Sequence, residues 1–171
     1  MAHFITCIPS KLTKQEFITQ FGGVFEHSAW VAERAYEQGL TAEDNDQEVL
    51  HDKMASILIS ANREDKMAVI LAHPDLAGKA AVAGDLTPES TSEQASAGIN
   101  LCNAEEFAQF THFNDSYKAK FNFPFIMAVK GANRHLILGA FEQRLQNTPE
   151  QEFEMAIQQI NKIALFRLRE L

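Results

Sequence analysis

Apolar residues recur three and four positions apart along most of the chain, a spacing that places them on one face of an α-helix. The pattern predicts helices over residues 14–21, 28–38, 46–60, 63–72, 88–113, 114–120, 133–146 and 149–170. Convincing alternation of apolar and polar residues, which is typical of a half-buried strand, is absent from the sequence. We therefore expect an all-α fold, a compact single-domain bundle of about eight or nine helices.

Local signals mark the limits of the helices. Thr148 precedes Pro149, and Gln151 follows three residues after the threonine, which gives an N-cap, a first-turn proline and a capping box together. The last helix therefore has a well-defined start. The short apolar run of residues 123–129 contains Pro124, which interrupts a helix, so we expect a buried extended linker there.

The last predicted helix places an arginine within its apolar stripe. The stripe advances three or four residues at a time through Phe153, Ile157, Ile160, Ala164, Arg167 and Leu171. Arg169 projects to the opposite side, so Arg167 is not simply a charge added at a helix end. A buried guanidinium needs an anion, and its two-pronged geometry suits a carboxylate. That carboxylate belongs either to a substrate or to the protein, and a third alternative is a stem along the core with its head in solvent.

A histidine stands where the helix over residues 63–72 must end. Pro74 disfavours helical geometry for His73, the residue before it. The last carbonyl groups of a helix carry negative partial charge, which favours a protonated imidazole and suits proton transfer near neutral pH. The alternative is a solvent-exposed histidine at a helix end with no chemical role.

Three polar residues share one face near the start of the next predicted helix. Thr87 and Pro88 form the start, and Ser90, Glu93 and Gln94 follow on the side that continues with Ala97 and Leu101. Ser90 and Glu93 also have the spacing of a capping box, a structural alternative. Because Thr87 already provides a cap, we favour an inward-facing hydroxyl, carboxylate and amide. Such groups suit a ligand with both donors and acceptors, such as a ureido compound.

Composition narrows the class of protein. The chain of 171 residues is 46% hydrophobic, enough for one core over residues 1–171. Its net charge is −8 and its basic residues are scattered, so no nucleic-acid partner is expected. Cys7 and Cys102 form no CxxC pair, the N-terminus lacks signal-peptide features and the apolar runs are short, so we expect a cytoplasmic protein that does not enter the membrane. Neither metal-ligand spacing nor a nucleotide-binding motif is present, so no metal and no cofactor are expected.

Several ordered blocks together resemble one known family. The blocks are residues 72–78, Leu86 and Thr87 through Ser90, Glu93 with Gln94, Ala97 with Gly98, Phe113 with Asn114, Tyr117, Lys120 with Phe121, and residues 123–126. They are similar to the 2-oxo-4-hydroxy-4-carboxy-5-ureidoimidazoline (OHCU) decarboxylases, which act late in the oxidation of urate to allantoin. The resemblance covers nearly the whole chain. Asn122 stands where glycine is expected, and Lys130 where arginine is expected.

The resemblance implies an all-helical homodimer that converts OHCU to (S)-allantoin and CO2 without a metal or organic cofactor. It makes His73 and Glu93 the catalytic residues, with His73 as acid/base. The residues that it implies for substrate binding are Pro74, Ser90, Glu93, Gln94, Phe125, Ile126, Met127, Ala128, Val129 and Arg167. Two alternatives remain: a non-catalytic helical binding module for a ureide or related small molecule, and a structural interaction protein in which Arg167 pairs with a protein carboxylate.

Overall fold

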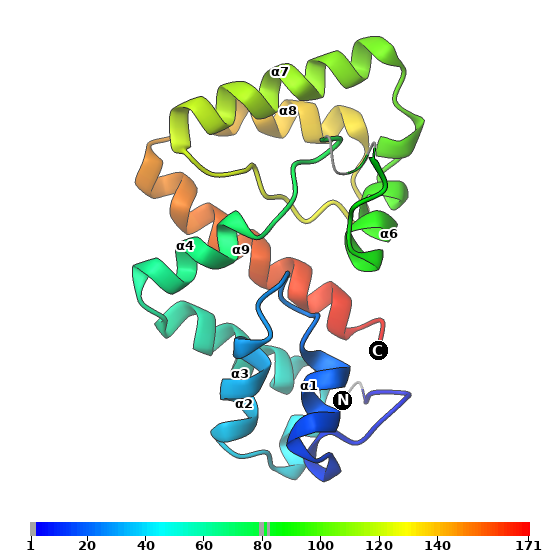
Figure 1. Cartoon of the computed structure of the whole chain (residues 1–171), viewed down its shortest axis with the longest axis vertical. Helices are drawn as coiled ribbons and strands as arrows, with labels where there is room; N and C mark the ends of the chain where they lie inside the picture. The colour runs from blue at the N-terminus through cyan, green and yellow to red at the C-terminus, as the bar shows by residue number, and fades with distance from the viewer. Residues whose placement is uncertain (1–2, 79–80, 82) are drawn as a thin grey trace. The chain divides into compact units, whose positions relative to one another are not determined.

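The computed structural model describes residues 3–78, 81 and 83–171, and its ordered elements are helices (Figure 1). They are α1 (Lys14–Phe21), α2 (Trp30–Glu37), α3 (Gln47–Ser60), α4 (Arg63–Leu71), α6 (Pro88–Ser96), α7 (Ala104–Phe121), α8 (Arg134–Arg144) and α9 (Pro149–Leu168), with short 3-10 helices at Pro9–Lys11, Ala42–Asn45 and Ile99–Leu101. These residues contain no strand, only an isolated bridge between His3 and Asp46. The predicted all-α fold is confirmed. None of the helices in this described part combines the length and apolar character that crossing a bilayer requires.

The chain divides into two compact units. One consists of Met1–Ala72 with Ile160–Leu171, and the other of His73–Gln159. In Figure 1 the first runs from blue to turquoise and includes the red end of α9, and the second runs from green to orange. The single domain over residues 1–171 stays a prediction.

The first unit is built on α1, α2 and α3, which pack against one another in chain order. Phe17 and Phe21 on α1 and Leu50 on α3 are completely buried in its core. Thr13 begins α1 with a capping box, in which its hydroxyl accepts from the Glu16 N–H and the Glu16 carboxylate accepts from the Thr13 N–H. Both local capping and burial of the apolar faces therefore support this helix.

An aromatic core fills the second unit, where α7 and α8 lie side by side (Figure 1). The rings of Phe125 and Phe141 stack with their centroids 3.7 Å apart, and Tyr117 meets both rings edge-on. Residues 122–129 have no helix or strand, and most of their side chains are buried. The predicted buried extended linker is confirmed. Its aromatic residues supply much of the core against which α7 and α8 pack.

The expected long helix over residues 88–113 is wrong. The chain leaves α6 after Ser96, passes through a left-handed Gly98 (φ +72°) and begins α7 after Asn103. Asn103 and Glu106 form a capping box at the start of α7. These residue types are a recognisable start signal in the sequence, but the apolar pattern continues across them and favoured one long helix. The expected break at residue 113 is also wrong, because α7 continues to Phe121. Leu101, expected on the buried face, is 71% exposed because the break precedes it.

The other helix limits lie within two residues of the prediction. Thr148 caps α9: its hydroxyl accepts from the Gln151 N–H at 3.2 Å, and the Gln151 side chain accepts from the Thr148 N–H at 2.9 Å. Before His73 and Pro74, α4 ends at Leu71. The prolines and short polar side chains therefore mark these limits as predicted.

The C-cap of α7 explains one departure from the resembled family. Asn122 has φ +62°, a left-handed conformation that glycine adopts without strain and asparagine tolerates better than other residues. We expect Asn122→Ala to lower the free energy of unfolding by about 1 kcal/mol. Asn122→Gly should leave it unchanged or raise it. Urea denaturation measures both variants, and an alanine variant as stable as the glycine variant would show that the cap conformation contributes nothing.

Candidate active site

His73 lies in a tight turn directly after α4 and is buried, with 9% of its surface exposed. The alternative of a solvent-exposed histidine is therefore wrong. Ala77 in the same turn has φ +51°. A Cβ at Gly78 would lie 2.6 Å from the Cβ of Asp75, so the turn closes only because this residue has no side chain. The backbone that carries His73 and Pro74 thus follows a narrowly defined path.

Gln94 on α6 ties this turn to the helix. Its Oε1 accepts from the Ala77 N–H at 3.0 Å, and its Nε2 donates to the Asp75 carbonyl at 3.5 Å. Gln94 is 5% exposed. Its amide therefore satisfies buried main-chain groups of the turn, a function that the sequence did not indicate. Its binding of substrate stays a prediction.

Two side chains of α7 hold the turn from another direction. Asn114 Nδ2 donates to the Leu76 carbonyl at 2.8 Å, and Lys118 Nζ lies 2.5 Å from Asp75 Oδ2. Asn114 is buried, whereas the Lys118 side chain is 42% exposed. The buried amide therefore contributes more to the definition of the turn than the solvent-screened ion pair does.

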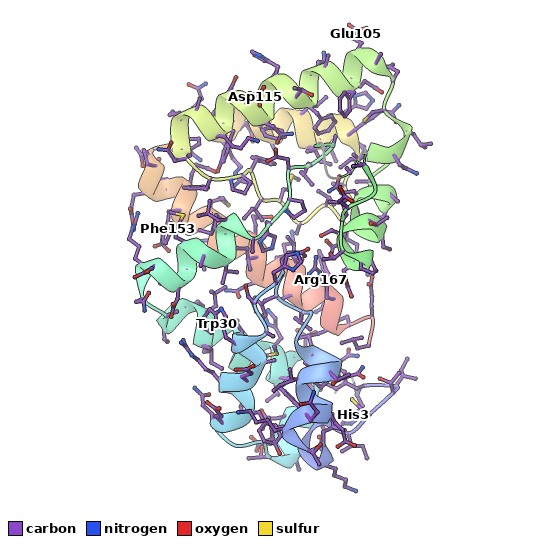
Figure 2. The ribbon with its side chains drawn as sticks, in the orientation of Figure 1. His3, Trp30, Glu105, Asp115, Phe153 and Arg167 are labelled. Carbon is purple, nitrogen blue, oxygen red and sulfur yellow. The ribbon has the colours of Figure 1, made fainter. Side chains whose placement is uncertain are left out.

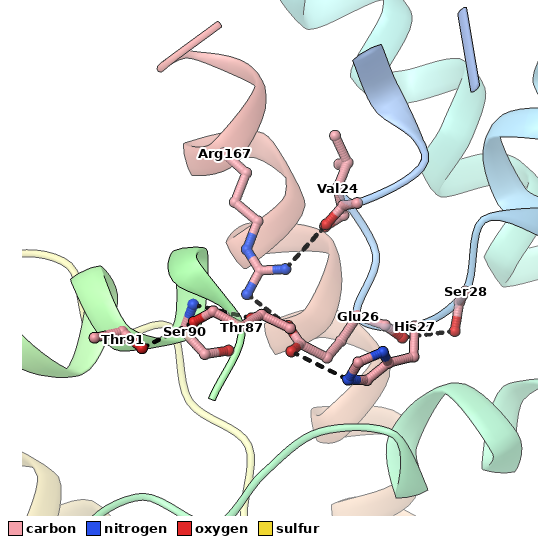
Figure 3. Close-up of polar contacts among 9 residues, drawn as sticks. Val24, Glu26, His27, Ser28, Thr87, Ser90, Thr91 and Arg167 are labelled. Carbon is pink, nitrogen blue, oxygen red and sulfur yellow. Dashed lines mark hydrogen bonds and ion pairs between the residues drawn. The ribbon is translucent and has the colours of Figure 1, made fainter. Parts of the chain in front are cut away.

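The inward polar face of α6 is confirmed at its first two turns. Ser90 and Gln94 are buried, as is Ala97 at the end of the helix, and Glu93 is partly exposed. The Thr87 hydroxyl accepts from the Ser90 N–H at 3.3 Å (Figure 3), so Thr87 is the cap. The alternative in which Ser90 and Glu93 form the capping box is wrong. A hydroxyl and an amide are thereby placed on the buried face, with a carboxylate beside them.

The segment of residues 125–129 lies in the same unit. Its side chains are buried except that of Met127, which is partly exposed. Arg144 Nη1 donates to the Ile126 carbonyl at 2.6 Å, and the Ala128 N–H donates to Gln159 Oε1 at 2.9 Å. Side chains from α8 and α9 therefore take the place of a strand partner for this main chain.

A buried ionic cluster that the sequence did not predict supports this segment. Glu152 is 0% exposed, accepts from Arg144 Nε at 2.9 Å and from Asn147 Nδ2 at 2.8 Å, and accepts the Tyr117 hydroxyl in a short hydrogen bond. Burial and, secondarily, the bond to Glu152 raise the pKa of Tyr117 well above its usual range, so the phenol remains a donor. The sequence carries no signal for this cluster, because a loop separates Arg144 from Glu152 and α7 supplies the tyrosine.

Arg167 lies near the end of α9 in the other unit (Figure 2) and is 5% exposed. Its Nη2 donates to Glu26 Oε2 at 2.8 Å, and its Nη1 lies 3.3 Å and 3.4 Å from the carbonyl oxygens of Gly23 and Val24 (Figure 3). The predicted inward position is confirmed, and the alternative with the head in solvent is wrong. The sequence left open whether Arg167 pairs with a carboxylate of the protein or of a substrate, and in the structure Glu26 supplies a protein carboxylate. Arg169 is exposed and pairs with Glu48 instead.

The predicted site residues thus fall in two groups. The turn with His73 and Pro74, the α6 residues Ser90, Glu93 and Gln94, and the segment 125–129 belong to the second unit, and the amide of Gln94 joins the turn to α6. Arg167 belongs to the first unit with Glu26. Over residues 3–78, 81 and 83–171, no group of three His, Cys, Asp or Glu side chains is arranged to hold a metal ion.

The hydrogen bond between Gln94 and the Ala77 N–H should contribute to the stability of the protein. We expect Gln94→Leu to lower the free energy of unfolding by about 1–3 kcal/mol, because the Ala77 N–H would remain buried without its acceptor. Gln94→Glu keeps an acceptor and should lose less. Urea denaturation of both variants tests this, and equal stability of Gln94→Leu and the unsubstituted protein would show that the bond does not hold the turn.

Comparison with known proteins places these features in a family. The family model described as OHCU decarboxylase matches residues 10–169. The 2-oxo-4-hydroxy-4-carboxy-5-ureidoimidazoline decarboxylase of Halalkalicoccus jeotgali is 37% identical over 159 residues, which cover 92% of this chain and 86% of that protein. The uric acid degradation bifunctional protein of Bacillus sp. (strain TB-90) is also 37% identical, over 162 residues and 95% of this chain. The chain spans 31% of the length of that bifunctional protein.

Solved structures give the same result. The crystal structure of (S)-allantoin synthase matches with a TM-score of 0.74 and 30% identity, over 94% of this chain and 51% of that one. The crystal structure of OHCU decarboxylase in the presence of (S)-allantoin matches with a TM-score of 0.69 and 25% identity, over 86% and 93% of the two chains. Because the family model matches residues 10–169 and the alignment with the 37% identical Halalkalicoccus jeotgali protein covers most of both chains, the chain belongs to the OHCU decarboxylase family.

Proposed function

We propose that the chain is a carboxy-lyase that converts OHCU to (S)-allantoin and CO2 in urate degradation. Its membership of the family carries this proposal, and the buried His73 in its tied turn supports it. An imidazole shielded from water and held on a defined backbone is suited to proton transfer at one position of a bound substrate. A histidine without a chemical role was expected to lie exposed at the helix end, whereas His73 is buried.

The reaction needs an electron sink and a proton. The bond between the ring carbon and its carboxylate breaks, CO2 leaves, and the electron pair moves into the adjacent ring C=N. The ring nitrogen of that C=N gains a proton, the hydroxyl proton is released as the carbonyl of allantoin forms, and a proton is added to the carbon that bears the ureido group. The carboxylate form of the substrate therefore takes up one proton overall. Because the substrate supplies its own sink, the step requires no organic cofactor or metal. The protein has to orient the substrate and move protons.

We assign these tasks to the predicted residues. His73 takes the hydroxyl proton or delivers the proton that is added, and its delivery to one face gives a single enantiomer. Glu93 and Gln94, with Ser90 beside them, hold ring and ureido groups through donors and acceptors. Arg167 holds the carboxylate or a carbonyl of the substrate. Within the second unit, Pro74 and the main chain of residues 125–129 line the substrate pocket.

A coupled assay tests the activity against the alternative of a binding module. Urate oxidase and hydroxyisourate hydrolase generate OHCU, and CO2 release and the circular dichroism of allantoin are followed with and without the protein. We expect rapid formation of (S)-allantoin. Racemic allantoin at the uncatalysed rate would contradict the proposed function and favour a module that binds a ureide without turnover.

We also propose that the protein is a cytoplasmic homodimer. The free thiols of Cys7 and Cys102 suit a reducing compartment, and the family resemblance supports the dimer. Sedimentation analysis at several concentrations tests the assembly, and a species with the mass of one chain throughout would contradict it.

A further inference from the structure

Two side chains form hydrogen bonds with the main chain of residues 125–129, one on each side of Met127. Arg144 Nη1 donates to the carbonyl of Ile126, and Gln159 Oε1 accepts from the N–H of Ala128. These two groups belong to the peptide units immediately before and after Met127. No other hydrogen bond to the main chain between Phe125 and Ala128 occurs among the described residues. The orientation of both peptide units therefore depends on two side chains.

The two hydrogen bonds also determine the directions in which the Met127 N–H and carbonyl groups point. In a trans peptide the C=O and N–H groups point to opposite sides of the chain, and the described residues contain no cis peptide bond. The Ile126 carbonyl points to Arg144, so the Met127 N–H points away from Arg144. The Ala128 N–H points to Gln159, so the Met127 carbonyl points away from Gln159. One donor and one acceptor of the same residue are thereby left for another partner.

The anchors are themselves held in place. Glu152 bonds Arg144, whose guanidinium carbon lies 4.2 Å from the centroid of the Phe125 ring. Gln159 projects from α9, a helix with a complete capping box at its start. Neither anchor needs to move when a ligand arrives, so the main chain of Met127 is oriented in advance.

We propose that Arg144 and Gln159 are positioning residues, which orient the Met127 N–H and carbonyl to bind the ureido or ring amide group of the substrate. This inference rests on the proposed function, in which residues 125–129 line the substrate pocket. A ureido or ring amide offers one N–H and one carbonyl close together, the complement of the pair on Met127. Neither positioning residue needs to touch the substrate.

Gln159→Leu tests the proposal, because it removes the acceptor for the Ala128 N–H while keeping a side chain of similar size. Gln158→Leu, at the exposed neighbouring position of the same helix, is the matched control. We expect Gln159→Leu to raise KM for OHCU and Kd for (S)-allantoin by about tenfold, the effect of one or two misaligned hydrogen bonds. The value of kcat should change less, since binding rather than proton transfer is affected. Because the Ala128 N–H would remain buried without its acceptor, Gln159→Leu should unfold at a lower temperature than the control, and KM and Kd are measured well below that temperature.

Gln159→Glu supplies a carboxylate acceptor at the same place and should recover most of the lost affinity. Amide hydrogen exchange of Ala128 gives an independent readout: exchange should accelerate in Gln159→Leu and return toward the original rate in Gln159→Glu. If the unsubstituted protein fails to turn over OHCU, the proposed function itself is contradicted. If it is active and Gln159→Leu has the KM of Gln158→Leu, or Gln159→Glu is as impaired as Gln159→Leu, the positioning proposal is overturned.

Discussion

His73→Asn is expected to lower kcat for OHCU by about 10²- to 10⁴-fold, the contribution typical of a positioned general acid or base. Asparagine retains a polar side chain of smaller size but cannot exchange a proton near neutral pH. The turn around His73 is held by Gln94 and Asn114, neither of which depends on the imidazole, so the variant should fold. The rate of CO2 release and the chirality of allantoin, measured on freshly generated OHCU, give the change in kcat.

The matched control for this experiment is His112→Asn, which changes an exposed histidine on α7 of the same unit. It should retain full activity. Circular dichroism and thermal unfolding establish that both variants are folded. Turnover by His73→Asn close to that of the control would remove His73 from the mechanism and leave its burial as a structural property alone.

Arg167→Met is expected to lower the free energy of unfolding by about 3–5 kcal/mol, because it removes the guanidinium that pairs with a buried carboxylate. The side chain of Glu26 is 1% exposed, so solvent cannot replace the guanidinium at 2.8 Å. Such a loss is a large part of the stability of an ordinary domain. Urea denaturation measures it, and a change below about 1 kcal/mol would show that the pair behaves like an exposed one.

The double variant Arg167→Met with Glu26→Leu separates the two roles of Arg167. Replacing a whole buried ion pair by apolar residues is often neutral or stabilising, so stability should return. If Arg167 also binds the substrate, kcat/KM should remain about 10- to 100-fold below the original value, as expected for a lost hydrogen bond to a charged group. Recovery of both stability and activity would show that Arg167 serves only the protein, the alternative that the sequence left open.

Local signals in the sequence predicted the fold well because they act over short distances. The periodic apolar faces, Thr148 with Gln151, and the stop before Pro74 all depend on residues no more than four positions apart. The long helix over residues 88–113 was mispredicted although its break had such signals. Gly98 and the capping box of Asn103 were outweighed by an apolar pattern that continues across them.

The candidate site could be predicted only in part. The buried faces of α6 and α9 and the buried linker of residues 125–129 follow from periodicity and composition, so Ser90, Gln94 and Arg167 were placed correctly. Their partners were not. Gln94 meets the turn of Ala77, and Tyr117 meets Glu152, only because separate helices lie against each other.

By itself, the sequence determined the helical class, most helix limits, the family resemblance and the side of each helix on which the polar residues lie. The tertiary structure alone decided which groups those residues bond. Arg167 and Glu26 are 141 positions apart, and Ala128 and Gln159 are 31 apart. Helix formation and capping are governed by neighbours within about one turn. A buried charge or peptide group instead takes whichever partner the folded path of the chain brings within hydrogen-bond distance.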